Sequence, residues 1–290
     1  METQLIKGST KLVGLIGNPV THSISPIIHN HAFRKLNLPF AYIPLGVDEK
    51  NLSKVIDLLH VLNFAGANIT IPYKTITPAY CDVLSDLSEV TGTVNTLFFK
   101  NGSLHGTTTD SEGFFNSLSH MNRIIKDDNI VILGNGGTAR TLCYALAFKK
   151  NFNSLTIIGR NNKRVENLCA EINSRTSSSF SYTTFETRKC IQTLQNCTLL
   201  INCTSVGMHP YVDNSPIPAD LFHDKMSVFD TIYNPPETLF LKNAAKAGCQ
   251  VQNGLYMLLF QGLASFKYWT GVSADKELFD DVDINSFLTE

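Results

Sequence analysis

A glycine-rich turn between a strand and a helix is the feature that most restricts the fold of this chain. Asn129–Leu133 is a continuous apolar run, typical of a parallel strand buried on both faces. It leads directly into Gly134-Asn-Gly-Gly-Thr-Ala139, which fits the pattern G-x-G-x-x-A, and then into a helix predicted over residues 138–149. In such turns the first glycine permits a tight bend, the second lets a pyrophosphate approach the backbone, and the helix N-terminus binds the phosphates. The turn therefore predicts a dinucleotide site.

The strand that follows this helix indicates which dinucleotide the turn would bind. An NAD site usually carries Asp or Glu about 20 residues beyond the glycines, where the carboxylate holds the ribose 2′-hydroxyl. Here the strand ends in Ile158-Gly-Arg-Asn161, with Lys163 and Arg164 behind it. The guanidinium of Arg160 can bind a 2′-phosphate through two hydrogen bonds. The sequence therefore favours NADP and leaves some use of NAD open.

The spacing of apolar segments predicts an α/β protein with two domains. Strands alternate with helices from residue 129 to residue 252, which is typical of a doubly wound parallel sheet. We predict a Rossmann-type dinucleotide-binding domain over residues 111–254 and a three-layer α/β substrate domain over residues 1–110, with a cleft between them. A last helix begins at Leu255, and residues 255–290 are expected to pack back on the first domain.

Composition excludes several classes of protein. The chain has 290 residues, 43% of them apolar, and a formal net charge of −1. A full core can form, but no basic field exists to attract nucleic acid or an anionic membrane. No apolar run approaches the roughly 18 residues of a membrane span, and the N-terminus has no signal-peptide pattern. We expect a cytoplasmic monomer or homodimer that binds a small molecule.

Cysteine and histidine spacing indicates no metal site. The seven cysteines form no Cys-x-x-Cys pair, which favours reduced thiols packed as small apolar residues. His29 and His31 lie two apart on a predicted helix, so their side chains point in different directions.

Polar residues gather at the predicted strand ends of the first domain. Asn68-Ile-Thr-Ile-Pro-Tyr-Lys74 alternates polar and apolar residues, so Asn68 and Thr70 are expected on one face of a strand that Pro72 ends. Lys74 then lies just past the strand. Taken singly, such residues have structural explanations: Asp110 can cap a helix, and Lys74 can be a surface lysine.

Taken together, the motifs resemble one family. Ser23-x-Ser-Pro, Asn68-x-Thr-x-Pro-x-Lys, Val94-Asn-Thr, Gly106-x-x-Thr-Asp and the glycine turn are followed by Asn202-Cys-Thr-Ser-Val-Gly-Met, Asp230-x-x-Tyr-Asn-Pro and Gly254-x-x-Met-Leu-x-x-Gln. In this order they resemble the shikimate dehydrogenase family, over residues 12–272. The resemblance implies an NADP-dependent oxidoreductase that reduces 3-dehydroshikimate to shikimate in aromatic amino acid biosynthesis.

The resemblance also implies roles for individual residues. Lys74 and Asp110 would be the catalytic pair. The implied substrate-binding residues are Ser23, Ser25, Asn68, Thr70, Asn95, Tyr233 and Gln261. With the glycine turn included, the cofactor-binding residues would be Gly134, Asn135, Gly136, Gly137, Thr138, Ala139, Arg160, Thr204 and Gly254.

The chemistry of hydride transfer agrees with the roles of the pair. A hydride that reaches a carbonyl carbon places negative charge on the oxygen, which needs a proton donor or cation within hydrogen-bond reach. Lys74 can supply both, and Asp110 can pair with its ammonium group or accept a hydrogen bond from a substrate hydroxyl. The sequence leaves open which of the two moves the proton.

Three positions depart from the family pattern. Thr108 stands where Asn is usual, Asn135 where Ala is common, and Gly159-Arg-Asn161 in place of Asn-Arg-Thr. Two alternatives therefore stay open: a quinate/shikimate dehydrogenase with dual use of NAD and NADP, and a cofactor-binding sensor without catalysis. Ser25 in place of a bulkier Thr favours shikimate by resemblance, and the presence of both Lys74 and Asp110 argues against the sensor.

Overall fold

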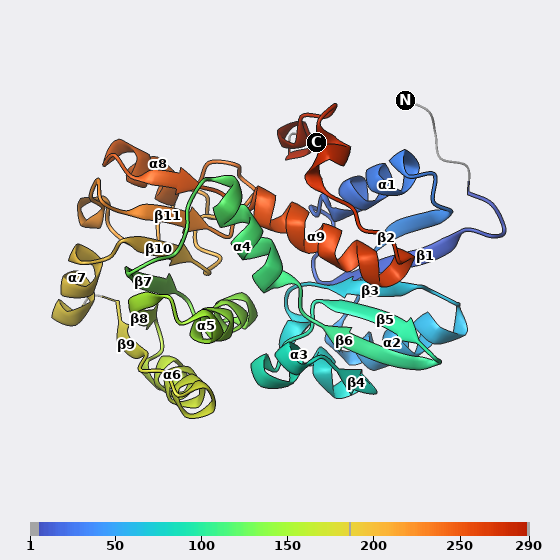
Figure 1. Ribbon diagram of the computed structural model, residues 1–290, viewed down its shortest axis with the longest axis horizontal. Helices are drawn as coiled ribbons and strands as arrows, with labels where there is room; N and C mark the ends of the chain where they lie inside the picture. The colour runs from blue at the N-terminus through green and yellow to red at the C-terminus, as the bar shows by residue number, and fades with distance from the viewer. Residues whose placement is uncertain (1–5, 186, 289–290) are drawn as a thin grey trace. The chain divides into compact units, whose positions relative to one another are not determined.

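The computed structural model describes residues 6–185 and 187–288, and the chain divides into two compact units (Figure 1). Unit 1 comprises Met1–Gly113 and Leu258–Glu290, and unit 2 comprises Phe114–Met257. The chain passes from one unit to the other inside two helices, α4 (Asp110–His120) and α9 (Leu255–Thr270). The sequence places the boundaries at residues 110 and 254, near the starts of these helices, whereas the units divide within their first turns.

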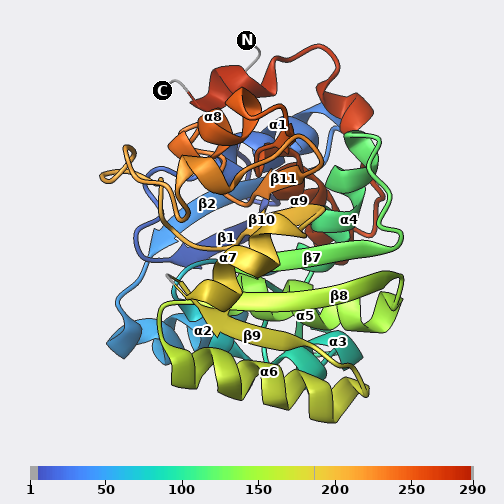
Figure 2. The same cartoon turned by 90° about the vertical axis from the view of Figure 1, so that its left-hand side faces the viewer.

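Unit 2 is built on one sheet of six strands: β7 (Asp128–Leu133), β8 (Phe152–Gly159), β9 (Ser181–Thr184), β10 (Leu199–Asn202), β11 (Ser227–Asp230) and β12 (Gln250–Gln252). Their order is β12-β11-β10-β7-β8-β9, and every neighbouring pair is parallel (Figure 2). The chain moves outward from β7 to β9 and then returns to β10 beside β7. The order therefore reverses next to β7, where α/β sheets of this type bind ligands. This arrangement confirms the predicted Rossmann-type sheet.

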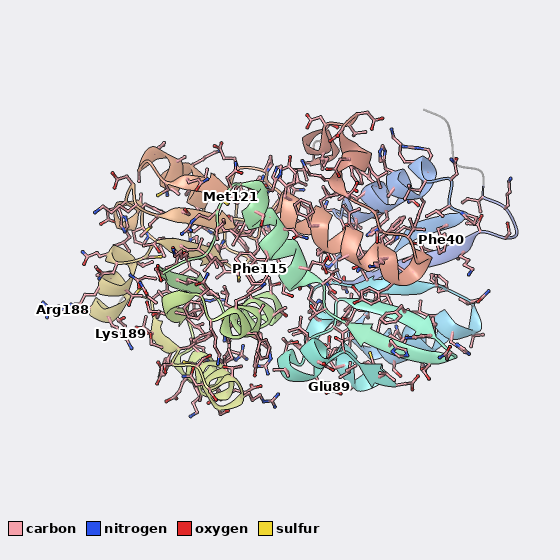
Figure 3. All side chains as sticks on the ribbon, in the orientation of Figure 1. Phe40, Glu89, Phe115, Met121, Arg188 and Lys189 are labelled. Atoms are coloured by element: carbon pink, nitrogen blue, oxygen red, sulfur yellow. The ribbon has the colours of Figure 1, made fainter. Side chains whose placement is uncertain are left out.

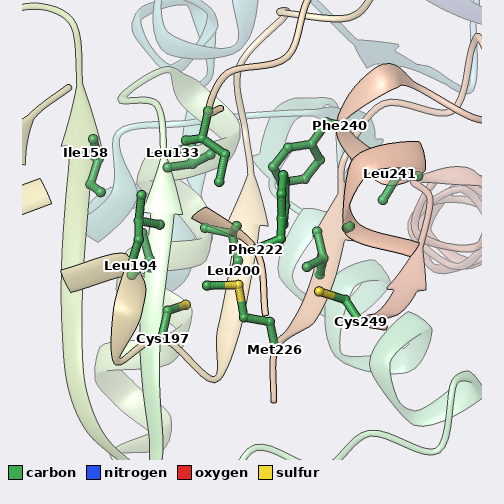
Figure 4. Close-up of a cluster of buried hydrophobic side chains, with 14 of the residues drawn as sticks. Leu133, Ile158, Leu194, Cys197, Leu200, Phe222, Met226, Phe240, Leu241 and Cys249 are labelled. Carbon is green, nitrogen blue, oxygen red and sulfur yellow. The ribbon is translucent and has the colours of Figure 1, made fainter. Parts of the chain in front are cut away.

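Helices cover both faces of this sheet. On one face α7 (Arg188–Gln195) and α8 (Leu239–Lys246) contribute Leu194 and Phe240 to a buried apolar cluster (Figure 4). Three cysteines, Cys190, Cys197 and Cys249, are buried in the same cluster, as expected of thiols that act as small apolar residues. The crossovers through α5 (Gly137–Lys149) and α6 (Asn162–Thr176) run in the opposite direction across the sheet, which places these helices on the other face.

Helix α7 is an element that our sequence analysis does not predict. Arg188 and Lys189 lie on its exposed side (Figure 3), so only Cys190 and Leu194 are buried. The helix begins at a cap, because the Thr187 hydroxyl accepts a hydrogen bond from the Cys190 N–H at 3.0 Å. With eight residues, the helix is shorter than the window over which a helical pattern is read from a sequence.

Unit 1 contains a mixed six-stranded sheet: β1 (Lys11–Gly17), β2 (Phe40–Gly46), β3 (Gly66–Ile69), β4 (Val83–Leu84), β5 (Thr96–Lys100) and β6 (Ser103–Thr107). The order is β2-β1-β3-β5-β6-β4. β1 pairs in parallel with β2 and β3, whereas β5 and β6 form the predicted antiparallel hairpin. Asn101 and Gly102 form its turn with φ values of 53° and 81°. The sequence does not predict the short strand β4 or α3 (Asp86–Thr91).

Two layers of helices enclose this sheet. α2 (Leu52–Val61) packs on one face with Ile56 and Leu59, and α1 (Ser25–Lys35) meets α9 on the other, where the rings of Phe33 and Phe266 stack 4.9 Å apart. The three-layer prediction is confirmed. α9 ends at Thr270 and two 3₁₀ turns follow, Lys276–Phe279 and Ile284–Leu288. Among the described residues, no helix combines the length and apolar character needed to cross a membrane.

A close approach of α9 to β3 and β5 fixes the centre of unit 1. The indole N–H of Trp269 donates to the carbonyl of Leu97 at 2.9 Å. A Cβ atom on Gly66 would lie 2.1 Å from this carbonyl oxygen and 2.6 Å from the indole nitrogen. Only glycine fits between the helix and the strand at this position.

Replacing Gly66 therefore separates α9 from the sheet. We expect Gly66→Ala to lower the free energy of unfolding by about 2–3 kcal/mol, since the methyl group meets backbone and a buried ring. Urea unfolding followed by far-UV circular dichroism measures this loss. Gly8→Ala is the control, because a Cβ there has no atom within 4 Å. Equal midpoints for the two variants would contradict the packing argument.

Candidate functional site

Lys74 and Asp110 form a partly buried ion pair in unit 1. Lys74 lies in a 3₁₀ turn, Tyr73–Thr75, that follows β3, and the Tyr73 hydroxyl anchors this turn on the carbonyl of Val47. Asp110 is the first residue of α4. Lys74 Nζ donates to Asp110 Oδ2 at 2.6 Å, and the two side chains are 17% and 4% exposed. The structure thus brings together two residues that lie 36 positions apart in the chain.

The amide of Asn95 holds this pair in place. Asn95 Nδ2 donates to Asp110 Oδ1 at 2.8 Å and to Gln261 Oε1 at 3.1 Å. Its Oδ1 accepts from the backbone N–H of Thr109 at 2.9 Å. Asn95 is only 2% exposed, so its hydrogen bonds are protected from water. Both carboxylate oxygens of Asp110 thereby accept a hydrogen bond, one from Lys74 and one from Asn95.

The side chain of Asn68 makes its hydrogen bonds within the protein. Its Oδ1 accepts from the Tyr42 hydroxyl at 2.9 Å, and its Nδ2 donates to the Asn95 carbonyl at 3.0 Å and to Ser265 Oγ at 3.1 Å. Asn68 is buried, and these contacts occupy its amide. Through these contacts Asn68 positions Asn95, and its implied contact with the substrate stays a prediction. β3 ends at Ile69, and the backbone N–H of Thr70, the next residue, donates to the Ile16 carbonyl of β1 at 2.9 Å.

Ser265 is a member of this network that the sequence did not reveal. Its hydroxyl donates to the carbonyl of Gln261, one helical turn earlier, at 2.9 Å. It also lies 2.7 Å from Thr96 Oγ1 and 3.1 Å from Thr109 Oγ1. The spacing of four residues from Gln261 on an apolar helix was the available signal, since it places both side chains on one face.

Three hydroxyl groups of unit 1 remain available as donors. No described residue accepts a hydrogen bond from the side chains of Ser23, Ser25 or Thr70. Ser25 is not a helix cap, because Ile24 occupies the N-cap of α1 and Ser25 is already helical. The methyl group of Thr70 lies where a side chain on Gly17 would be, with Cγ2 only 2.3 Å from such a Cβ. These hydroxyls can donate to an anionic or hydroxylated ligand.

His29 lies behind this cluster as a neutral core residue. Its ring stacks on Tyr42 at 4.4 Å and packs edge-on against Trp269 at 5.2 Å. Complete burial lowers the pKa of His29 to about 3, and a hydrogen bond with Asn68 opposes this shift only in part. His31 instead contacts Arg34 and the Leu278 carbonyl, so the two histidines have different partners.

The glycine turn of unit 2 fits a dinucleotide. Gly134 has φ +108°, and a Cβ on it would lie 3.0 Å from the Cys203 carbonyl oxygen, so both conformation and packing require glycine. Gly136 has an ordinary φ of −78°, and a Cβ on it would meet no atom within 4 Å. Neither the backbone nor the protein's packing requires glycine at 136. An open approach to the backbone in front of α5 is what a pyrophosphate needs.

The other candidate cofactor residues are placed in different ways. Arg160 follows β8 on the surface, and no described residue pairs with its guanidinium. The Thr204 hydroxyl donates to Asn202 Oδ1 at 2.7 Å, which fixes the loop after β10. Gly254 is required by packing, since a Cβ there would lie 2.2 Å from the Thr231 carbonyl oxygen. Tyr233 is half-buried in the loop after β11.

A buried Asn202–Asp230 pair joins the ends of β10 and β11. Asn202 Nδ2 donates to Asp230 Oδ1 at 3.0 Å, and the Thr238 hydroxyl donates to Asp230 Oδ2 at 2.7 Å. Burial raises the pKa of Asp230 to about 6, and the hydrogen bonds from Thr238, Ile232 and Asn202 oppose this increase. Both residues lie in motifs that the sequence highlights, but the sequence alone assigns neither of them to a site.

The raised pKa makes the stability of unit 2 depend on pH. The folded protein holds the Asp230 proton more tightly than the unfolded chain, whose carboxyl has a pKa of about 3.8. Stability from this group is therefore complete below about pH 4 and is lost as pH rises to about 6. We expect the unfolding free energy of the wild type, minus that of Asp230→Asn, to fall by about 2–3 kcal/mol over this window. Urea unfolding of both proteins from pH 4 to 7 tests this, and parallel pH profiles would show the expectation to be wrong.

Known proteins share both units. The model of the shikimate dehydrogenase substrate binding domain matches residues 15–97, that of shikimate / quinate 5-dehydrogenase matches residues 118–234, and that of the shikimate 5′-dehydrogenase C-terminal domain matches residues 254–281. A shikimate dehydrogenase (NADP(+)) of Methanococcus aeolicus is 38% identical over 283 residues, which covers 97% of this chain and 99% of that protein. The chain belongs to the shikimate dehydrogenase family.

Solved shikimate dehydrogenases have the same architecture. One in complex with NADP+ has a TM-score of 0.89 and 35% identity, and covers 98% of this chain and 96% of its own. One from Listeria monocytogenes, in complex with shikimate and NAD, has a TM-score of 0.88 and 32% identity, with 97% and 98% covered. Family members have thus been solved with either dinucleotide.

Proposed function

We propose that this chain catalyses the reversible NADP-dependent reduction of 3-dehydroshikimate to shikimate. The observation that carries the proposal is the Lys74–Asp110 ion pair, held by Asn95 and Gln261, in a member of the shikimate dehydrogenase family. A cation and a carboxylate at this spacing suit proton transfer to the oxygen of a ketone that is being reduced. The near-neutral, hydroxyl-rich surroundings suit a polyhydroxylated ring.

The hydrogen bonds favour Lys74 as the group that moves the proton. Both oxygens of Asp110 already accept hydrogen bonds from Lys74 and Asn95, so its carboxyl group is placed as an acceptor. Lys74 Nζ uses one N–H on Asp110 and has two further N–H donors. In the reduction, Lys74 donates a proton to the carbonyl oxygen as the adjacent carbon gains a hydride. In the oxidation, neutral Lys74 accepts the hydroxyl proton.

Neutral donors hold the substrate in this proposal. Ser23 and Ser25 bind its carboxylate at the start of α1, and Thr70, Asn95 and Gln261 contact the ring hydroxyls. Tyr233 is proposed as a further substrate-binding residue. Asn68 is also proposed to contact a ring hydroxyl, and its side-chain amide donates to the Asn95 carbonyl.

The residues around the glycine turn are proposed to hold NADP. NADPH supplies the hydride when bound. The turn residues Gly134 to Ala139 receive the pyrophosphate at the N-terminus of α5, and Arg160 pairs with the 2′-phosphate. Thr204 and Gly254 contribute from neighbouring loops. A cytoplasmic location, an oligomeric state of monomer or homodimer, and the absence of nucleic-acid and membrane partners remain predictions from composition.

Removing the ammonium group tests the assigned mechanism. Lys74→Met keeps the length and apolar stem of the side chain, and we expect kcat/KM for shikimate oxidation with NADP+ to fall by about 10³-fold. The affinity for NADPH, measured by its fluorescence on binding, is expected to stay within about twofold of the wild type. Lys54→Met, an exposed position on α2, controls for the loss of one surface charge. Turnover by Lys74→Met equal to that of Lys54→Met would exclude Lys74 from the chemistry.

A four-way kinetic comparison tests the substrate and the cofactor. We expect kcat/KM to be highest for shikimate with NADP+, because the extra ring hydroxyl of quinate needs a further partner and because Arg160 suits a 2′-phosphate. The second candidate is an enzyme that also uses NAD. It is favoured by the strand end Gly159-Arg-Asn161, which offers only one charged group to a 2′-phosphate. Initial rates with shikimate and quinate, each with NADP+ and NAD+, discriminate the two. Equal values for both acids would instead indicate a dual-substrate quinate/shikimate dehydrogenase.

A further inference from the structure

Two of the positions that depart from the family pattern, Asn135 and Gly159, lie side by side in unit 2. Asn135 follows β7 and Gly159 ends β8, and the backbone N–H of Gly134 donates to the Ile158 carbonyl at 2.7 Å between them. A Cβ atom on Gly159 would lie 3.9 Å from both Cγ and Oδ1 of Asn135. The amide of Asn135 therefore occupies the space next to the missing side chain.

The packing around Gly159 explains why that strand end has no side chain. A Cβ there would lie 2.7 Å from Cγ2 of Val165, a fully buried residue of α6. Val165 is β-branched and packed in the core, so it has little freedom to move away. A side chain that contacts the cofactor can therefore reach this position only from a neighbouring strand.

Asn135 is suited to be that group. It is partly exposed, and no described residue makes a hydrogen bond with its amide. Arg160, the next residue after Gly159, also has no described partner. An amide and a guanidinium without protein partners thus lie at the end of the second strand of the Rossmann unit, where the ribose 2′ substituent of a dinucleotide is read.

We propose that Asn135 is a specificity-determining residue, whose amide donates a hydrogen bond to the 2′-phosphate of NADP and takes the place of the side chain that Val165 excludes from position 159. The inference rests on the proposed function, because it assigns one contact within the proposed NADP site. Asn135 and Arg160 together then form the 2′-phosphate site, one as a neutral donor and the other as a cation.

An isosteric change of charge tests this contact. Asn135→Asp keeps the shape of the side chain but replaces the donor by a carboxylate, which repels a phosphate and can accept from a 2′-hydroxyl. We expect the Kd for NADP+ and for adenosine 2′,5′-bisphosphate, measured by isothermal titration calorimetry, to rise at least tenfold. The Kd for NAD+ and for 5′-AMP is expected to change by less than about threefold. Asn135→Ala should give a smaller loss of the same selectivity.

Asn151→Asp is the matched control. Asn151 directly precedes β8, so it lies at the opposite end of this strand from Gly159, and the substitution adds the same charge. We expect it to leave all four Kd values unchanged. Equal weakening of NADP+ and NAD+ by Asn135→Asp, or no change in either, would overturn the proposal while leaving the proposed function in place. Failure of the wild type to bind NADP+ would overturn both.

Discussion

One buried amide, that of Asn95, is the contact on which the proposed active site depends. It joins Asp110 at the start of α4 to Gln261 in α9, and it precedes β5 in the middle of the sheet. An amide that loses its partners in such a place costs about 1–3 kcal/mol, so the network is stable only when all of its members are present. The C-terminal helix therefore belongs to the site as much as to the core. A chain that lacks α9 would keep Lys74, Asp110 and Asn95 but would lose Gln261, which accepts a hydrogen bond from the Asn95 amide.

Unit 2 uses a similar pair for a different purpose. Asn202 holds Asp230 much as Asn95 holds Asp110, and in each case the asparagine amide donates to a carboxylate oxygen. The second partner distinguishes them. Asp110 faces an ammonium group, whereas Asp230 faces a hydroxyl and a backbone N–H, with burial raising its pKa. The first arrangement places two opposite charges together, and the second ties two strand ends together beside the point where the sheet order reverses.

The sequence predicted what local patterns encode. The apolar run of β7, the glycine turn and the alternation of strands and helices identified the Rossmann-type sheet, and Asn101-Gly102 identified the hairpin. Long-range contacts needed more. The Lys74–Asp110 pair followed only from a family resemblance, because no periodicity links residues 36 positions apart. The hydrogen bond between Asn68 and Ser265 could not be predicted because it depends on α9, and α7 was missed because it buries so few side chains.

The position of Trp269 has a consequence for spectroscopy. It is the only tryptophan of the chain, and it is buried in unit 1, with its indole bonded to β5 and its ring against His29. Its emission therefore reports on the folding of unit 1 and is silent on the Rossmann-type sheet, whereas circular dichroism detects both units. If tryptophan fluorescence and circular dichroism gave the same unfolding transition, the two units would unfold together in one cooperative step.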